Sequence, residues 1–78
     1  MPTLFRKSGL RFYFYSSGGK EPPHVHITGE GGEAKFWILP IQLEWSRGFG
    51  PGTLLRIESL LWDNQSLILE KWNEFFDN

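Results

Sequence analysis

The feature that most constrains this chain is a change in hydrophobic period close to residue 50. Before that point apolar residues alternate with polar ones, as they do in β-strands that have one buried face. After it apolar residues recur every three or four positions, as they do along one side of an α-helix. The order of the two patterns predicts a sheet followed by helices, which is an α+β fold.

Several segments before residue 50 are expected to be strands. Residues 11–15 alternate aromatic side chains, and residues 24–28 and 33–39 alternate apolar with polar ones. A glycine-rich turn at residues 29–32 joins the latter two into a β-hairpin. Residues 41–45 fit either a further short strand or a helical turn. We therefore expect a small antiparallel sheet of three to four strands.

The register of the hairpin follows from its turn. If the turn has four residues, Thr28 lies opposite Glu33, and counting back gives two further pairs. These pairs are His26 with Lys35 and His24 with Trp37. The same register collects the apolar side chains on one face, namely Val25, Ile27, Ala34, Phe36 and Ile38. A slip of one residue would mix apolar with polar side chains on each face.

The chain is short enough that residues 1–78 are expected to form a single domain. The sheet should occupy about residues 4–47. A C-terminal two-helix hairpin should occupy about residues 51–76 and back the apolar face of the sheet. Asp63 and Asn64 favour caps and turns, so they mark the junction of the two helices.

With both helices on the apolar face, no expected element remains to cover the other face of the sheet. The chain has 4 Trp, 7 Phe and 2 Tyr, which is more aromatic surface than so small a domain readily buries. We therefore expect the open face to bind a partner. The candidate partner-binding residues on it are Arg11, Tyr13, Tyr15, Lys35 and Trp37.

Composition excludes several classes of protein. The chain has no cysteine, which removes disulfides, thiolate nucleophiles and cysteine-based zinc sites. Its formal net charge of -1 does not indicate a strongly basic nucleic-acid binder. No secretory signal is visible, and no apolar run approaches the ~20 residues that a membrane-spanning helix needs. A cytoplasmic protein without membrane attachment is expected.

The chain has two histidines, His24 and His26, and they lie two residues apart on one strand. Two imidazoles on one face can bind a divalent metal together with a third ligand, for which Glu33 is the nearest candidate. The same pair are the candidate catalytic residues of a general acid–base enzyme. The competing interpretation is that both are ordinary surface histidines with no cofactor. Lys35 opposite His26 disfavours a cation there.

The aromatic and basic residues of the open face also have two interpretations. In composition they resemble platforms on which single-stranded nucleic acid stacks. Aromatic residues and arginine are equally enriched where proteins associate. Because the net charge is slightly negative, we favour a protein partner or a homodimer over single-stranded nucleic acid.

The stretches PPHVHI, GEAKFWI, SRGF and WNEFF resemble motifs of a known family. That family of small bacterial and archaeal proteins is catalogued as domain of unknown function 4160, and the similarity runs from Met1 to Phe76. The matching residues are Pro22, Pro23, His24, Val25 and His26, then Glu33, Ala34 and Lys35, then Trp72, Asn73 and Glu74. Gly50-Pro51 stands where the family has a Ser-Pro helix start.

The resemblance implies no established activity. It implies a gene that lies beside another small gene, as in toxin–antitoxin-like pairs. The expected function is therefore a small bacterial interaction protein, one component of such a two-gene module, that binds a protein through its open sheet face. The alternative is a metal-dependent or histidine-assisted nuclease or phosphoesterase that uses the His-x-His strand.

Overall fold

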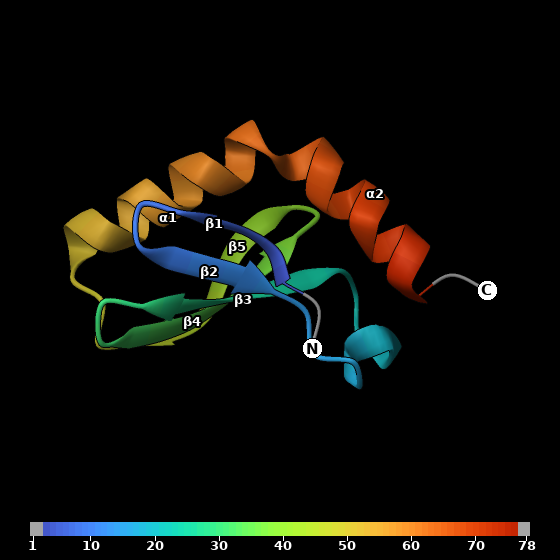
Figure 1. Cartoon of the computed structure of the whole chain (residues 1–78), viewed down its shortest axis with the longest axis horizontal. Coiled ribbons are helices and arrows are strands. Elements are labelled where there is room, and N and C mark those ends of the chain that lie inside the picture. The colour runs from blue at the N-terminus through green and yellow to red at the C-terminus, as the bar shows by residue number, and fades with distance from the viewer. Residues whose placement is uncertain (1–2, 77–78) are drawn as a thin grey trace.

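The computed structural model describes residues 3–76, so Met1 and Pro2, where the family resemblance begins, lie outside the described residues. It has an antiparallel sheet of five strands followed by two helices, which confirms the α+β fold (Figure 1). The strands lie in chain order across the sheet. Their bounds are β1 Thr3–Lys7, β2 Leu10–Tyr13, β3 His24–Gly29, β4 Gly32–Ile38 and β5 Ile41–Arg47.

The sheet has more strands than the expected three to four because β1 was not predicted. Residues 41–45, which fitted a strand or a helical turn, belong to the strand β5. The β3–β4 register is the predicted one, with His24 opposite Trp37, and it closes at Gly29 opposite Gly32. Glu30 and Gly31 form the tip with φ angles of 53° and 79°, the left-handed values that a tight two-residue hairpin turn requires.

The two helices are α1, Pro51–Asp63, and α2, Gln65–Phe76. Gly50 is the N-cap of α1 and supplies no side-chain cap. Asn64 is the predicted junction, and its side-chain amide donates to Leu60 O at 2.8 Å. Within residues 3–76, neither helix is long and apolar enough to cross a bilayer.

The helices do not fold back on each other as the expected hairpin would. Figure 1 shows α1 and α2 as two arms of one arch along a single side of the sheet. A reversal between helices takes about two to five loop residues, and Asn64 alone separates these two. The arch lets one helix after the other cover the sheet.

The core lies between the arch and the predicted apolar face of the sheet. Val25, Ile27 and Phe36 are almost inaccessible to solvent and belong to one buried cluster with residues from both helices. The helical members of that cluster are Ile57, Leu61, Ile68 and Trp72. The prediction of which sheet face the helices cover is confirmed.

The loop between β2 and β3 was expected to leave the other face uncovered, and this expectation is wrong at one end of the sheet. The loop contains a short 3-10 turn, Gly18–Lys20, that packs beside the end of α2. A Cβ atom on Gly19 would lie 2.6 Å from the ring of Phe76, and one on Gly18 would lie 3.1 Å from the ring of His24. Because both positions lack a side chain, the loop reaches over His24.

Candidate functional site

The candidate site is the sheet face that points away from the helices, and we call it the aromatic face. It is defined by Tyr13, Tyr15, His24, His26, Lys35, Trp37 and Trp45. Strand pairing arranges four of these side chains in one row across β2 to β5, in the order Tyr13, His26, Lys35 and Trp45. A second row holds His24 and Trp37, at the end of the sheet nearer the 3-10 turn.

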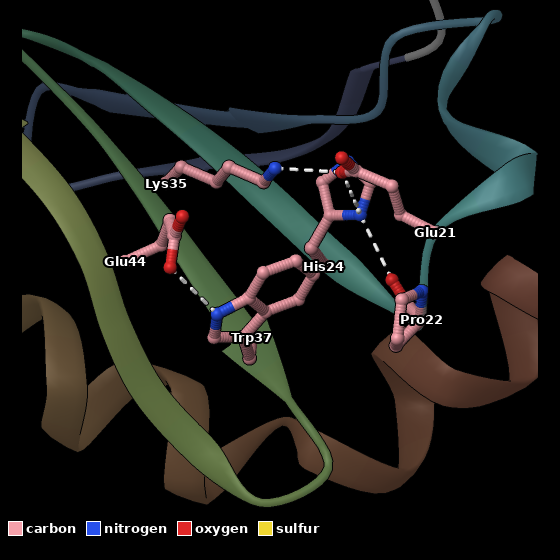
Figure 2. Close-up of polar contacts among 6 residues, drawn as sticks. All are labelled: Glu21, Pro22, His24, Lys35, Trp37 and Glu44. Atoms are coloured by element: carbon pink, nitrogen blue, oxygen red, sulfur yellow. Dashed lines mark hydrogen bonds and ion pairs between the residues drawn. The ribbon is translucent and has the colours of Figure 1, made fainter.

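His24 is buried, with 2 % of its surface exposed, although it was expected on an open face. Its Nδ1 atom lies 2.9 Å from Pro22 O, so this nitrogen donates a hydrogen bond to the carbonyl (Figure 2). Its ring centroid lies 5.7 Å from that of Trp37 and 5.1 Å from that of Trp72. His24 therefore joins the aromatic face to the core at the end of β3.

His26 is also buried, with 7 % of its surface exposed, so it too departs from the expected open position. Its ring packs against those of Tyr15 and Tyr13, with centroids 4.2 Å and 5.6 Å away. Burial, followed by the nearby His24 and Lys35, lowers the pKa of His26 to about 4. The imidazole is therefore neutral at physiological pH.

The two tyrosines differ in their access to solvent. Tyr13 is 4 % exposed, and burial together with a hydrogen bond to Tyr15 raises its pKa to about 12. The guanidinium of Arg11 lies over the Tyr13 ring, 4.4 Å from its centroid. Tyr15 is 37 % exposed and packs edge-on against Tyr13, with ring centroids 5.4 Å apart. Of this pair, Tyr15 is the one that a partner can reach.

Lys35 and Trp37 form the middle of the face and are fixed by polar contacts. Lys35 Nζ lies 2.6 Å from Glu21 Oε1 and 4.6 Å from the centroid of the Trp37 ring. The hydrogen bond from Lys35 lowers the pKa of Glu21. The indole nitrogen of Trp37 donates to Glu44 Oε1 at 3.0 Å (Figure 2). Both side chains are half-buried and held in place.

Trp45 belongs to this face, although strict alternation along β5 would place it on the side of Leu43. The pairing of β4 with β5 shifts between Lys35 and Phe36, which makes Glu44 an extra residue in β5. Leu43 pairs with Phe36 on the helix side, whereas Trp45 pairs with Lys35 on the aromatic face. A β-bulge breaks the period of two in this way, and no residue type in β5 signals it.

Trp45 is 39 % exposed and lies beside a charged pair at the edge of the face. The guanidinium of Arg47 lies 5.7 Å from the centroid of the Trp45 ring. Arg47 also forms a two-nitrogen ion pair with Glu33, in which its Nε donates to Glu33 Oε1 at 3.1 Å. This hydrogen bonding raises the pKa of Arg47.

The structure does not bring the predicted metal ligands together. Glu33 is paired with Arg47, and the Nδ1 atom of His24 is occupied by Pro22 O. Two loop carboxylates are engaged as well, Glu21 with Lys35 and Glu30 with Arg56. In the part of the chain that the structure describes, no three His, Cys, Asp or Glu side chains converge on a common point.

Comparison with known proteins agrees with the motif resemblance. Residues 9–73 match the family described as Domain of unknown function (DUF4160). The match covers most of the 78 residues, so the chain belongs to that family. No curated protein and no solved structure matches the chain.

Proposed function

We propose that this chain is a cytoplasmic interaction protein that binds a protein partner through its aromatic face. The observation that carries this proposal is the pair of exposed aromatic side chains, Tyr15 and Trp45, on either side of a fixed centre. Aromatic residues of this kind contribute most of the binding energy in many protein interfaces. Isolated exposed aromatics are common, but clustered ones typically mark a binding surface.

The spacing of the aromatic face suits a short stretch of polypeptide. Tyr13, beside Tyr15, is separated from Trp45 by three strand spacings, which amount to about 14 Å. An extended segment of about four residues covers that length. The half-buried ring of Trp37 lies beside this path and provides an apolar floor.

The centre of the face is already ordered before a partner arrives. Trp37 is held by Glu44 and by the ring of His24, and Lys35 is held by Glu21. Ordering rotamer-rich side chains on binding costs roughly 0.5–1.5 kcal/mol each. A face whose side chains are fixed in the free protein avoids much of this cost, which favours specific binding.

The charges on the face favour a protein over single-stranded nucleic acid. Lys35 is matched by Glu21, and Arg47 is matched by Glu33. Nucleic-acid binding depends on cations that are free to neutralise phosphates. Glu44 adds a further carboxylate beside Trp37, which would repel a phosphate chain. A partner with its own mixed charges suits this surface better.

The burial of the two imidazoles favours the interaction function over the alternative of a histidine-assisted or metal-dependent enzyme. A general base must lie within hydrogen-bonding reach of the proton that it removes. His24 and His26 are 2 % and 7 % exposed, and both rings are enclosed by other aromatic rings. Their packing indicates that they support the shape of the face.

We take the partner to be the product of an adjacent small gene, as in a toxin–antitoxin-like module. The test is calorimetric titration of that product with the wild-type chain and with Tyr15→Ala and Trp45→Ala. Each substitution should weaken binding by roughly 2 kcal/mol, or about 30-fold. Leu67→Ala is the matched control, since Leu67 is 39 % exposed but lies on α2.

Three results would contradict the proposal. The adjacent product could fail to bind the wild-type chain, or it could bind Tyr15→Ala and Trp45→Ala as tightly as wild type. Alternatively, the two variants could lose a salt-dependent affinity for single-stranded RNA while binding the protein normally. That last result would assign the aromatic face to nucleic acid.

A further inference from the structure

The two edges of the sheet differ in how well they are protected from pairing with another strand. β1 is five residues long, ends in the exposed cations Arg6 and Lys7, and has an irregularity after Thr3. Short length, charge and bulges are the usual protection of an edge strand. β5 is seven residues long and contains no lysine or proline. It also has an irregularity at Glu44 and two charged residues, but Glu44 accepts a hydrogen bond from Trp37 and Arg47 is paired with Glu33, so both charged groups are engaged within the chain.

Exposed apolar side chains lie along the β5 edge. They are Leu39 at 64 %, Leu43 at 40 %, Leu55 at 67 % and Trp62 at 56 % exposed. Leu43 and Leu55 line a groove of about 380 Å³ between β5 and α1, together with Phe36, Pro51, Leu54 and Glu58. Exposed leucines beside an apolar groove are costly in water unless another surface covers them.

The apolar side chains continue beyond this groove. Trp62 follows Leu55 by two helical turns, so both side chains lie on the same side of α1. Gln65 Nε2 donates to Ile38 O at 2.8 Å, which brings the junction of the helices over the turn that carries Leu39. The edge therefore has apolar side chains at both of its ends, over the roughly 23 Å that seven strand residues span.

We propose that a second copy of this chain pairs with it along β5, so that two five-stranded sheets form one antiparallel sheet. The backbone groups on the outer side of β5 select an extended strand as the occupant. A second copy supplies such a strand together with a matching apolar surface. Its Leu43 and Leu55 side chains cover those of the first copy across a two-fold axis.

The residues of β5 favour one register for this pairing. With Leu43 opposite Leu43 of the second copy, Gln42 lies opposite Glu44, and its amide can donate to the carboxylate on both sides of the axis. A register centred on Glu44 would place two carboxylates opposite each other, which is unfavourable. The Leu43 register also places Leu43 and its copy on the helix side, between the two α1 helices.

The difference between the two edges explains why the assembly would stop at two copies. Pairing through β5 leaves a β1 strand at each outer edge of the combined sheet. Arg6 and Lys7 protect those edges, so further strands are not added. An isologous contact of this kind gives a closed dimer rather than a fibre. A different protein that offered a free strand would not necessarily carry apolar side chains that cover Leu43 and Leu55, whereas a second copy does so by symmetry.

The proposal is tested by sedimentation equilibrium of the purified chain over a wide range of concentrations, without any partner. The wild-type chain should be a dimer. Leu43→Lys and Leu55→Lys should each raise the dimer dissociation constant by at least about 30-fold, because a buried lysine replaces a central apolar contact. Leu67→Lys is the control, since Leu67 is 39 % exposed but lies outside the groove.

Hydrogen exchange adds a readout that depends on the backbone. Amides of β5 that point away from β4 should become protected as the concentration of chain rises, and Leu55→Lys should abolish this protection. Leu55 is 67 % exposed, so this substitution keeps the fold even if Leu43→Lys does not. A monomeric wild-type chain, or a dimer that Leu55→Lys leaves intact, would overturn the proposal. Tyr15→Ala, remote from β5, should leave the dimer unchanged and so separates this surface from the aromatic face.

Discussion

The buried imidazole of His26 makes the stability of the fold depend on pH in a range where carboxylates contribute little. The pKa of His26 is about 4 in the folded chain, against about 6.5 when the side chain is exposed. The unfolded chain therefore binds more protons than the folded chain between these two values. The free energy of unfolding must fall as the pH decreases from about 6.5 towards 4.

The size of the effect follows from the difference between the two pKa values. A difference of about 2.5 units corresponds to roughly 3 kcal/mol, at about 1.4 kcal/mol for each unit. The stabilisation is complete above the unfolded pKa and is lost by the time the pH reaches the folded pKa. For a small domain whose total stability is about 5–15 kcal/mol, this loss is large.

The assay is urea unfolding followed by tryptophan fluorescence at a series of pH values from about 4.5 to 8, which covers most of the interval between the folded and unfolded pKa values of His26. The wild-type free energy of unfolding should fall steeply below pH 6.5. In His26→Gln, which has no proton to gain at this position, the curve should be flatter. His24 is common to both proteins, so the difference between the two curves reports His26.

A second substitution defines the lower limit of the pH range in which His26, and not Glu21, accounts for the loss of stability. The hydrogen bond from Lys35 lowers the pKa of Glu21 below 4.5, so its contribution to stability is lost only at more acid pH. From pH 8 to about 5 the Glu21→Gln curve should therefore run parallel to the wild-type curve, lowered by a constant amount. If wild type and His26→Gln lose stability in parallel, burial does not depress the pKa of His26 and the argument is refuted.

Four further substitutions test the packing, and added Zn²⁺ tests for a metal site. Phe36→Ala should destabilise the fold by roughly 3–5 kcal/mol in urea, because it empties the core, whereas Trp37→Ala should cost roughly 1–2 kcal/mol; equal losses would mean that both faces are core. Gly48→Ala should destabilise the fold, because a Cβ atom there would lie 2.5 Å from Gly31 O and the residue has a φ of +78°. Gly52 has open space around it, so Gly52→Ala should stabilise α1 by about 0.5–1 kcal/mol in the same assay. Excess Zn²⁺ should not raise the melting temperature in calorimetry; a rise equivalent to about 2.7 kcal/mol would reveal a site filled at a hundred times its dissociation constant.

The parts of the fold that could be predicted are those set by neighbours in the sequence. The β3–β4 register followed from the glycine-rich turn expected at residues 29–32 and from the alternation of side chains on both strands. The division into sheet and helices followed from the two hydrophobic periods. Asn64 was correctly placed at the helix junction because its side chain caps the preceding turn.

The missed features are those in which the period is interrupted. β1 places the half-buried Leu4 and Phe5 side by side, and its pairing with β2 is irregular at this point, so alternation does not reveal it. The extra residue Glu44 moves Trp45 to the aromatic face in the same way. In both places the register is set by pairing with the neighbouring strand, and the sequence of one strand alone does not predict that pairing.

The burial of the histidines was missed for a different reason. Alternation correctly assigned His24 and His26 to the face opposite Val25 and Ile27, but it does not report what else covers that face. The cover over His24 comes from Gly18, brought there by a loop that packs on the far end of α2. Contacts of this kind join residues distant in the sequence, and composition alone suggested an exposed loop.

The two proposed surfaces share a physical origin in the size of the domain. A chain of 78 residues buries only about 60 % of the surface that its unfolded form exposes, so one core cannot enclose all of its large apolar side chains. Tyr15 and Trp45 remain on one side of the sheet, and Leu39, Leu43, Leu55 and Trp62 remain along one edge. Trp45 belongs both to the β5 edge and to the aromatic face, because the extra residue Glu44 directs its side chain to that face. Pairing of two chains along β5 would therefore bring the two aromatic faces together on one side of a continuous sheet, and a partner would meet both of them as a single surface.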